Sequence, residues 1–84
     1  PRGMTRVWIG AGRATGVGRR ELTAVFADEL GVPARDLGNI DVSDRFSLVD
    51  VPGGIADYVV STLNGVRMNG RQVTVRLDRG GSVA

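Results

Sequence analysis

The sequence has no cysteine and no histidine among its 84 residues. It therefore lacks a thiol nucleophile, an imidazole acid–base catalyst and the usual zinc ligands, which disfavours most enzyme and metalloprotein classes. No apolar run reaches transmembrane length and no signal-peptide core is present, so we expect a soluble protein without a membrane partner. A chain of this length predicts one small domain. It begins at Pro1 rather than at methionine, and we expect it to be part of a longer protein.

Lysine is also absent, and the arginines gather at the two ends of the chain. Residues 1–20 hold five arginines and no acid, residues 65–84 hold four arginines and one aspartate, and the middle holds two arginines and eight acids. A GC-rich genome explains the missing lysine better than function does. It does not explain the clustering, and arginine presents a planar fork of donors that suits phosphates and base edges. The distribution therefore indicates a polyanion as partner.

Alternating apolar residues, helical spacing, and glycine and proline signals predict the element order β-α-β-β-α-β. We expect a strand over 5–10, a helix between Gly18 and Gly31 with Glu21 at its third position, strands over 40–42 and 46–51, a helix from Pro52 to Asn64, an Asn69-Gly70 turn and a strand over 73–77. Right-handed crossovers make this an α+β ferredoxin-like sandwich, a four-stranded antiparallel sheet with two helices on one face. Its first and last strands are neighbours, so the arginine-rich ends meet. We expect residues 5–79 to form the domain, with flexible segments at 1–4 and 80–84.

The same alternation predicts which side chains lie on the sheet face that the helices leave open. The candidate RNA-binding residues are Arg6, Trp8, Arg13, Arg45, Phe46, Leu48 and Arg76. Exposed aromatic rings on a sheet can stack bases, whichever base is present. We assign stacking to Trp8 and Phe46 and phosphate or base-edge contacts to the arginines, with Arg45 either a contact or a salt-bridge partner. A register shifted by one residue would turn Phe46 toward the helices, and Trp8 could instead pack on a tail or a partner domain.

Within the glycine-rich stretch 10–18, residues 10–16 resemble a dinucleotide-binding fingerprint. That chemistry needs a helix that starts within the glycines, whereas the helical pattern here begins only at Leu22. We therefore interpret the stretch as a flexible cationic loop whose Arg13 reaches a phosphate, or as a solvated loop that binds nothing. The carboxylates of Asp41, Asp44 and Asp50 are interpreted as surface groups rather than a metal or acid–base site.

Several stretches resemble known RNA-binding signatures. Val7-Trp8-Ile9 resembles the first signature of RNA recognition motifs and residues 44–51 resemble the second, although Leu48 and Asp44 depart from its aromatic and basic positions. Over nearly the whole chain, through residues 9–13, 38–42, 44–52 and 70–75, the sequence is similar to the C-terminal RNA-binding domain of bacterial DEAD-box RNA helicases of the DbpA/DeaD type.

This resemblance implies a non-catalytic domain, without cofactors and monomeric in isolation. It would anchor a helicase core in cis to structured, usually ribosomal, RNA in the cytoplasm, in ribosome biogenesis or cold shock. The alternative is a ferredoxin-like domain that binds a protein or a small regulatory ligand. An enzyme is the least favoured class.

Overall fold

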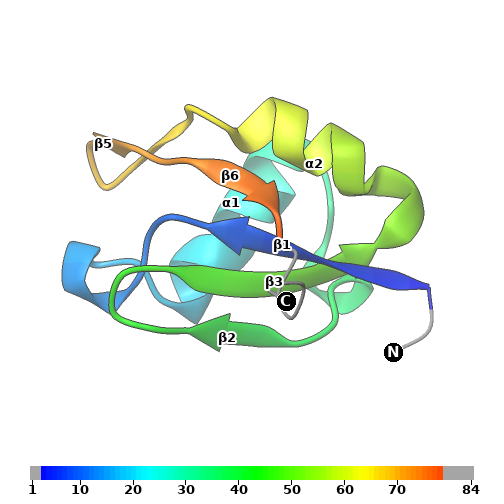
Figure 1. The fold of residues 1–84 in the computed structure, drawn as a ribbon, viewed down its shortest axis with the longest axis horizontal. Coiled ribbons are helices and arrows are strands. Elements are labelled where there is room, and N and C mark those ends of the chain that lie inside the picture. The colour runs from blue at the N-terminus through cyan, green and yellow to red at the C-terminus, as the bar shows by residue number, and fades with distance from the viewer. Residues whose placement is uncertain (1–2, 79–84) are drawn as a thin grey trace, which may run out of the picture.

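The computed structural model describes residues 3–78 as an antiparallel sheet with two helices packed on one face (Figure 1). The elements are β1 (Met4–Ile9), α1 (Arg19–Leu30), β2 (Ile40–Val42), β3 (Ser47–Pro52), α2 (Ala56–Leu63), β4 (Arg67–Met68), β5 (Arg71–Gln72) and β6 (Val75–Leu77). Short 3-10 turns lie at Arg13–Thr15, Ala34–Asp36 and Gly53–Ile55. The main sheet has four strands in the order β2-β3-β1-β6. The predicted α+β ferredoxin-like arrangement is confirmed, including the contact between its first and last strands.

The strand register decides which side chains face the helices. Val7 of β1 lies opposite Val49 of β3 and Leu77 of β6, and both valines are fully buried. Ser47 and Val51 are buried on the same face as Val49, as the alternation predicted. The alternative register, in which Phe46 would face the helices, is wrong.

The core fills the layer between the sheet and the two helices. Its largest fully buried side chains come from all of these elements and from the loop before α1: Phe26, Ile9, Leu22, Leu63, Val7, Val17, Val49, Val51 and Val59. Burying a side chain of this size contributes about 1.5–3 kcal/mol relative to leaving it exposed. The helices thus pack on one side of the sheet, and over residues 3–78 no helix covers the other face (Figure 1).

The ends of α1 follow the predicted signals. The carboxylate of Glu21 accepts a hydrogen bond from the backbone N–H of Gly18 at 2.9 Å, which satisfies one of the unpaired donors at the helix start. This bond lowers the pKa of Glu21 below its ordinary value. Gly31 closes the helix at φ 70°, in the left-handed region that favours glycine. Leu22, Phe26 and Leu30 face the core, as their spacing predicted.

Pro52 does not open the second helix, contrary to the prediction. It is the last residue of β3, opposite Met4 of β1, and α2 begins only at Ala56 after the 3-10 turn Gly53–Ile55. The N–H of Gly53 donates to the carbonyl of Gly3 at 2.7 Å, so pairing between the two segments continues past the proline. A proline signal fits both a helix start and a strand end, and tertiary pairing decided between them.

The predicted Asn69-Gly70 turn is confirmed. Asn69 and Gly70 have φ of 54° and 81°, as expected for the tight turn that joins β4 to β5. The last strand is shorter than predicted, because Val73 exchanges backbone hydrogen bonds with Val66 and Gly65 rather than with β1. The side-chain alternation still holds, with Val75 buried and Arg76 exposed.

β1 begins at Met4, one residue before the predicted strand and inside the segment that we expected to be flexible. Pro1, Arg2 and the predicted tail at 80–84 lie outside the described residues. Over residues 3–78, neither helix has the length and apolar character needed to cross a membrane.

Candidate nucleic-acid interface

The open face carries three side chains in contact, Trp8, Phe46 and Arg76, which we call the aromatic cluster. The ring centroids of Trp8 and Phe46 are 6.1 Å apart, and their planes are inclined by 14°. The guanidinium carbon of Arg76 lies 4.3 Å from the centroid of the indole. Trp8 stands directly opposite Arg76 across the β1–β6 pair and opposite Leu48 across the β1–β3 pair. The sheet thus brings together four of the seven predicted site residues.

Gly10 makes room for the indole at the end of β1. A Cβ added to Gly10 would lie 3.1 Å from Cζ3 and 3.2 Å from Cη2 of Trp8, closer than ordinary van der Waals contact. The N–H of Gly10 donates to the carbonyl of Thr74 at 2.8 Å, which holds the ends of β1 and β6 together. A larger residue at this position would displace the indole, so Gly10 belongs to the site.

Trp8 and Phe46 remain half-buried, and Arg76 is exposed. An aromatic pair contributes about 0.5–1.5 kcal/mol beyond its buried area. A cation over an aromatic ring contributes about 0.5–1 kcal/mol at an exposed position. These contacts hold the rings in place before any ligand arrives, without removing them from solvent.

Arg6, which we predicted to contact phosphates or base edges, forms an ion pair within the sheet. Its Nε donates to Oδ1 of Asp50 at 3.0 Å, directly across the β1–β3 pair. The Asp50 side chain is only 5% exposed, against 40% for Arg6, so Asp50 is a buried partner rather than a surface group. The hydrogen bond to Asp50 raises the pKa of Arg6, and the charges of Asp41 and Asp78 act in the same direction. The positive charge of Arg6 is therefore already matched.

The glycine-rich loop is held by hydrogen bonds and is not flexible in the way we expected. Every backbone N–H from Gly10 to Gly18 donates to an acceptor within the domain. Arg13 and Ala14 donate to the carbonyls of Ser43 and Asp44, each at 2.9 Å. No amide in this stretch is left to bind a pyrophosphate, which excludes the dinucleotide interpretation.

Ser47 fixes the same loop from the sheet. Its fully buried hydroxyl donates to the carbonyl of Ala11 at 2.7 Å. Gly12 packs against the backbone at Ser43 and Asp44 so closely that an added Cβ would overlap with it. The loop and the β2–β3 turn therefore form one rigid end of the sheet, and Figure 1 shows the two segments side by side at the left.

Two arginines project from this end. Arg13 is exposed, and its Nη1 donates to the carbonyl of Val42 at 2.8 Å, so one N–H is used and the rest of the fork faces solvent. Arg45 is exposed and makes no hydrogen bond or ion pair with any other residue of 3–78. With Arg76 they form a group that we call the cationic end. Within the described chain, none of its members is paired with a carboxylate.

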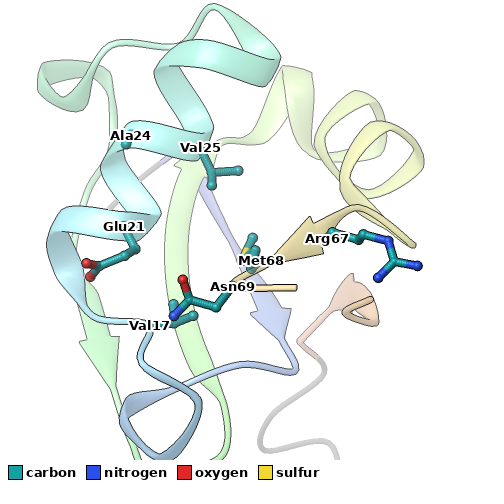
Figure 2. A pocket seen from close by; sticks show the side chains of 7 residues that line it. All are labelled: Val17, Glu21, Ala24, Val25, Arg67, Met68 and Asn69. Carbon is teal, nitrogen blue, oxygen red and sulfur yellow. The ribbon is translucent and has the colours of Figure 1, made fainter. Parts of the chain in front are cut away.

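A pocket of about 250 Å³ lies on the helix side of the domain, between α1 and the β4–β5 hairpin (Figure 2). It is lined by Val17, Glu21, Ala24, Val25, Arg67, Met68 and Asn69. The side-chain amide of Asn69 is not free to bind a ligand, because its Nδ2 donates to the carbonyls of Thr15 and Gly16 at 2.9 and 3.0 Å. Arg67 points away from the pocket in Figure 2 and donates to Gly70. The pocket therefore presents few free donors to an anion, and the open sheet face is the better candidate for a nucleic-acid interface.

The family of the chain follows from comparison with known proteins. The family model described as the DbpA RNA binding domain matches residues 6–77, which run from within β1 to the end of β6 and include both helices. The chain belongs to the DbpA RNA-binding domain family. The resemblance noted in the sequence is confirmed.

Curated relatives of this DbpA-type domain are longer proteins. An uncharacterized protein of Treponema pallidum is 29% identical over 79 residues, which make up 94% of this chain and 35% of that protein. Two proteins named ATP-dependent RNA helicase DeaD, from Buchnera aphidicola of Acyrthosiphon pisum and of Schizaphis graminum, are 28% and 27% identical over 71 residues. These residues are 84% of this chain and 12% of each helicase. The chain thus spans well under half the length of these relatives.

Sequence reasoning missed three residues that shape this face of the DbpA-type domain. Asp50 occupies an outward position of an apolar strand, and a charge there is a signal for a cross-strand partner. Gly10 and Gly12 gave no signal beyond loop formation, because their function is to allow close approach by atoms distant in sequence.

Among residues 3–78, no group of three or more acidic side chains is placed to hold a metal ion.

Proposed function

We propose that this DbpA-type domain binds RNA through its aromatic cluster and cationic end, and so anchors a helicase core in cis to structured RNA. The observation that carries the proposal is the contact of Arg76, Trp8 and Phe46 on the open face. Two half-exposed rings lie beside arginines that are not paired with a carboxylate of residues 3–78, and such a surface suits an unpaired base and its phosphates.

In this mechanism a base takes the position of Arg76 over the indole. The displaced guanidinium then reaches the phosphate next to that base, exchanging a contact of about 0.5–1 kcal/mol for a charge-assisted hydrogen bond. Stacking the base on the ring adds about 1–3 kcal/mol. Phe46 lies beside Trp8 and can support the base or a neighbour, whereas Leu48 offers apolar contact only.

Arg45 and Arg13 follow the RNA backbone away from the rings. Arg45 has no partner to give up within residues 3–78, and Arg13 keeps its bond to Val42 while the outer part of its fork binds phosphate. Arg6 has a lesser role in this proposal, because leaving Asp50 would expose a buried carboxylate without compensation.

The identity of the longer protein and of its RNA is also part of the proposal. The relatives named DeaD helicases support a helicase core in cis. We further propose ribosomal RNA as the partner, a monomeric domain, and a cytoplasmic role in ribosome biogenesis or cold shock. The domain supplies binding, and catalysis belongs to the core.

A titration of labelled ribosomal RNA hairpins at two or more salt concentrations tests the proposal. Trp8→Ala should weaken binding by about 5- to 150-fold, which corresponds to the free energy of one stacked base. Arg76→Ala should reduce the slope of log K against log salt by roughly 0.7–0.9, the value for one phosphate contact.

Arg35→Ala is the matched control, because Arg35 is an exposed arginine in the connection between α1 and β2. It should change neither the affinity nor the slope. Unchanged RNA affinity in both Trp8→Ala and Arg76→Ala would refute the assigned surface. A stable dimer without RNA affinity, seen by light scattering, would favour the protein-interaction alternative.

A further inference from the structure

One side chain ties the β4–β5 hairpin to the glycine-rich loop. Nδ2 of Asn69, at the tip of the hairpin, donates to the carbonyls of Thr15 and Gly16, which lie 54 and 53 residues away in the sequence. In Figure 2 the amide of Asn69 points from the hairpin toward Val17 of the loop. The approach is close at Gly16, where an added Cβ would overlap with Nδ2 of Asn69. The hairpin therefore holds the loop by direct contact.

The amide meets the part of the loop that carries Arg13. Residues Arg13–Thr15 form a 3-10 turn that ends at Gly16, whose φ is 79°. On one side this turn is bound to the sheet, because the N–H groups of Arg13 and Ala14 donate to carbonyls of the β2–β3 turn, each at 2.9 Å. On the other side it is bound to the Asn69 amide. The turn is thus clamped between the sheet and the hairpin.

The exposed side chain of Arg13 extends from this clamped turn. Its Nη1 donates to the carbonyl of Val42 at 2.8 Å, so its backbone and its guanidinium are both held before any ligand binds. An arginine held in this way loses less conformational freedom on binding a phosphate than a free one does. A turn bound on the sheet side alone could pivot about those hydrogen bonds and would carry the guanidinium with it.

The side chain and the backbone of Asn69 have separable tasks. The backbone has φ 54°, as the tight turn between β4 and β5 requires. Glycine adopts this left-handed conformation readily, so the turn itself does not need an amide. The side chain of Asn69 instead serves the loop, through its two hydrogen bonds to Thr15 and Gly16.

We infer that Asn69 is a positioning residue for RNA binding, because it fixes the turn from which Arg13 reaches a phosphate. This inference rests on the proposed function and deepens it. It makes the hairpin, which packs on the helix side of the domain, a support for the RNA-binding surface without any contact to RNA. Because Asn69 acts through Arg13, substitutions at the two positions should have non-additive effects on RNA affinity.

A double-mutant cycle between Asn69 and Arg13, with labelled ribosomal RNA hairpins as the probe, tests the inference. Asn69→Gly removes the amide and keeps the left-handed turn. It should weaken RNA binding several-fold in the parent and have little further effect in the Arg13→Ala background. It should also reduce the slope of log K against log salt, by less than the roughly 0.7–0.9 expected for Arg13→Ala.

Gln72→Ala is the matched control for the loss of an amide. Gln72 is exposed in β5 of the same hairpin, and its side chain makes no hydrogen bond with any other residue of 3–78. This variant should change neither the RNA affinity nor the salt slope. Fully additive effects of Asn69→Gly and Arg13→Ala, or an Asn69→Gly variant that binds RNA as the Gln72→Ala control does, would overturn the inference.

Amide hydrogen exchange without RNA separates positioning from general stability. In Asn69→Gly, the amides of Arg13 and Ala14 should exchange faster, whereas those of the buried Val7 and Val49 should keep the rates of the parent. Faster exchange throughout the sheet, or unchanged exchange at Arg13 and Ala14, would overturn the inference. If Arg13→Ala alone leaves RNA affinity unchanged, the phosphate contact in the proposed function is wrong, and the inference fails with it.

Discussion

Replacing Gly12 by alanine should destabilise the domain strongly, although the substitution adds a single methyl group. The Cβ of alanine would overlap with the carbonyl oxygen of Ser43 and would lie 2.8 Å from the carbonyl carbon and oxygen of Asp44. These are backbone atoms, so no side chain can rotate away. Gly12 has φ −159°, an extended conformation open to any residue, and the penalty is therefore steric rather than conformational.

The expected magnitude follows from the contacts that must be given up. Relieving the overlap separates the loop from the β2–β3 turn and breaks the hydrogen bonds from Arg13 to Ser43 and from Ala14 to Asp44. Each such bond contributes about 1 kcal/mol net, and overpacking of a tight site costs about 1–3 kcal/mol. We expect a loss of about 3–5 kcal/mol in the free energy of unfolding. A domain of this size has roughly 5–15 kcal/mol in total.

Urea denaturation followed by circular dichroism and by Trp8 fluorescence measures this loss. Gly54→Ala is the matched control, because an added Cβ there meets nothing within 4 Å and its φ is not positive. That variant should remain within about 0.5 kcal/mol of the parent. A Gly12→Ala variant whose stability lies within about 1 kcal/mol of the control would show that the loop is not locked against the turn.

Two further predictions concern charged groups. Glu21→Gln retains an acceptor for the Gly18 N–H but cannot titrate. The pKa of Glu21 is lowered in the folded state, so its contribution to the free energy of unfolding is fully present above the ordinary pKa of 4.5 and is lost as pH falls through the lowered pKa. In the Glu21→Gln variant, the fall in stability between neutral pH and strong acid should be smaller by this contribution. A stability–pH curve identical to that of the parent would argue against the helix cap. Arg6→Ala should lower the free energy of unfolding, because it leaves the buried carboxylate of Asp50 unpaired. The slope of log K for RNA binding against log salt should not change. A slope reduced as much as in Arg76→Ala would show that Arg6 contacts phosphate.

Much of the fold was predictable because local signals agreed with one another. The alternation in β1 and β3 predicted that Trp8 and Phe46 share the open face, since a strand with one buried face has only one acceptable register. The Glu21 and Gly31 signals predicted the ends of α1 for reasons that lie within a few residues of each. These elements depend on neighbours in sequence, and a single sequence is enough to predict them.

The errors arose where atoms distant in sequence decide the outcome. Arg6 is paired with the carboxylate of Asp50, which lies opposite it on β3. The two residues are 44 positions apart in the sequence, so no local pattern predicts this pair. The glycine-rich loop was interpreted as flexible because glycine is permissive, whereas Gly12 is needed there for close approach to another segment. The local signal of Pro52 predicts the start of a helix. Its pairing with Met4 in the assembled sheet, which no local pattern indicates, makes it the end of a strand instead.

The aromatic cluster takes its three side chains from the first strand, from the residue just before the third strand, and from the last strand of the main sheet. During synthesis, a growing chain cannot complete the cluster until Arg76 has emerged and β6 has paired with β1. The same holds for a chain that has partly unfolded, because pairing between distant segments forms only as the whole sheet does. On the proposed function, competence to bind RNA is therefore a late property of the folding domain, because unfinished chains lack an assembled aromatic cluster.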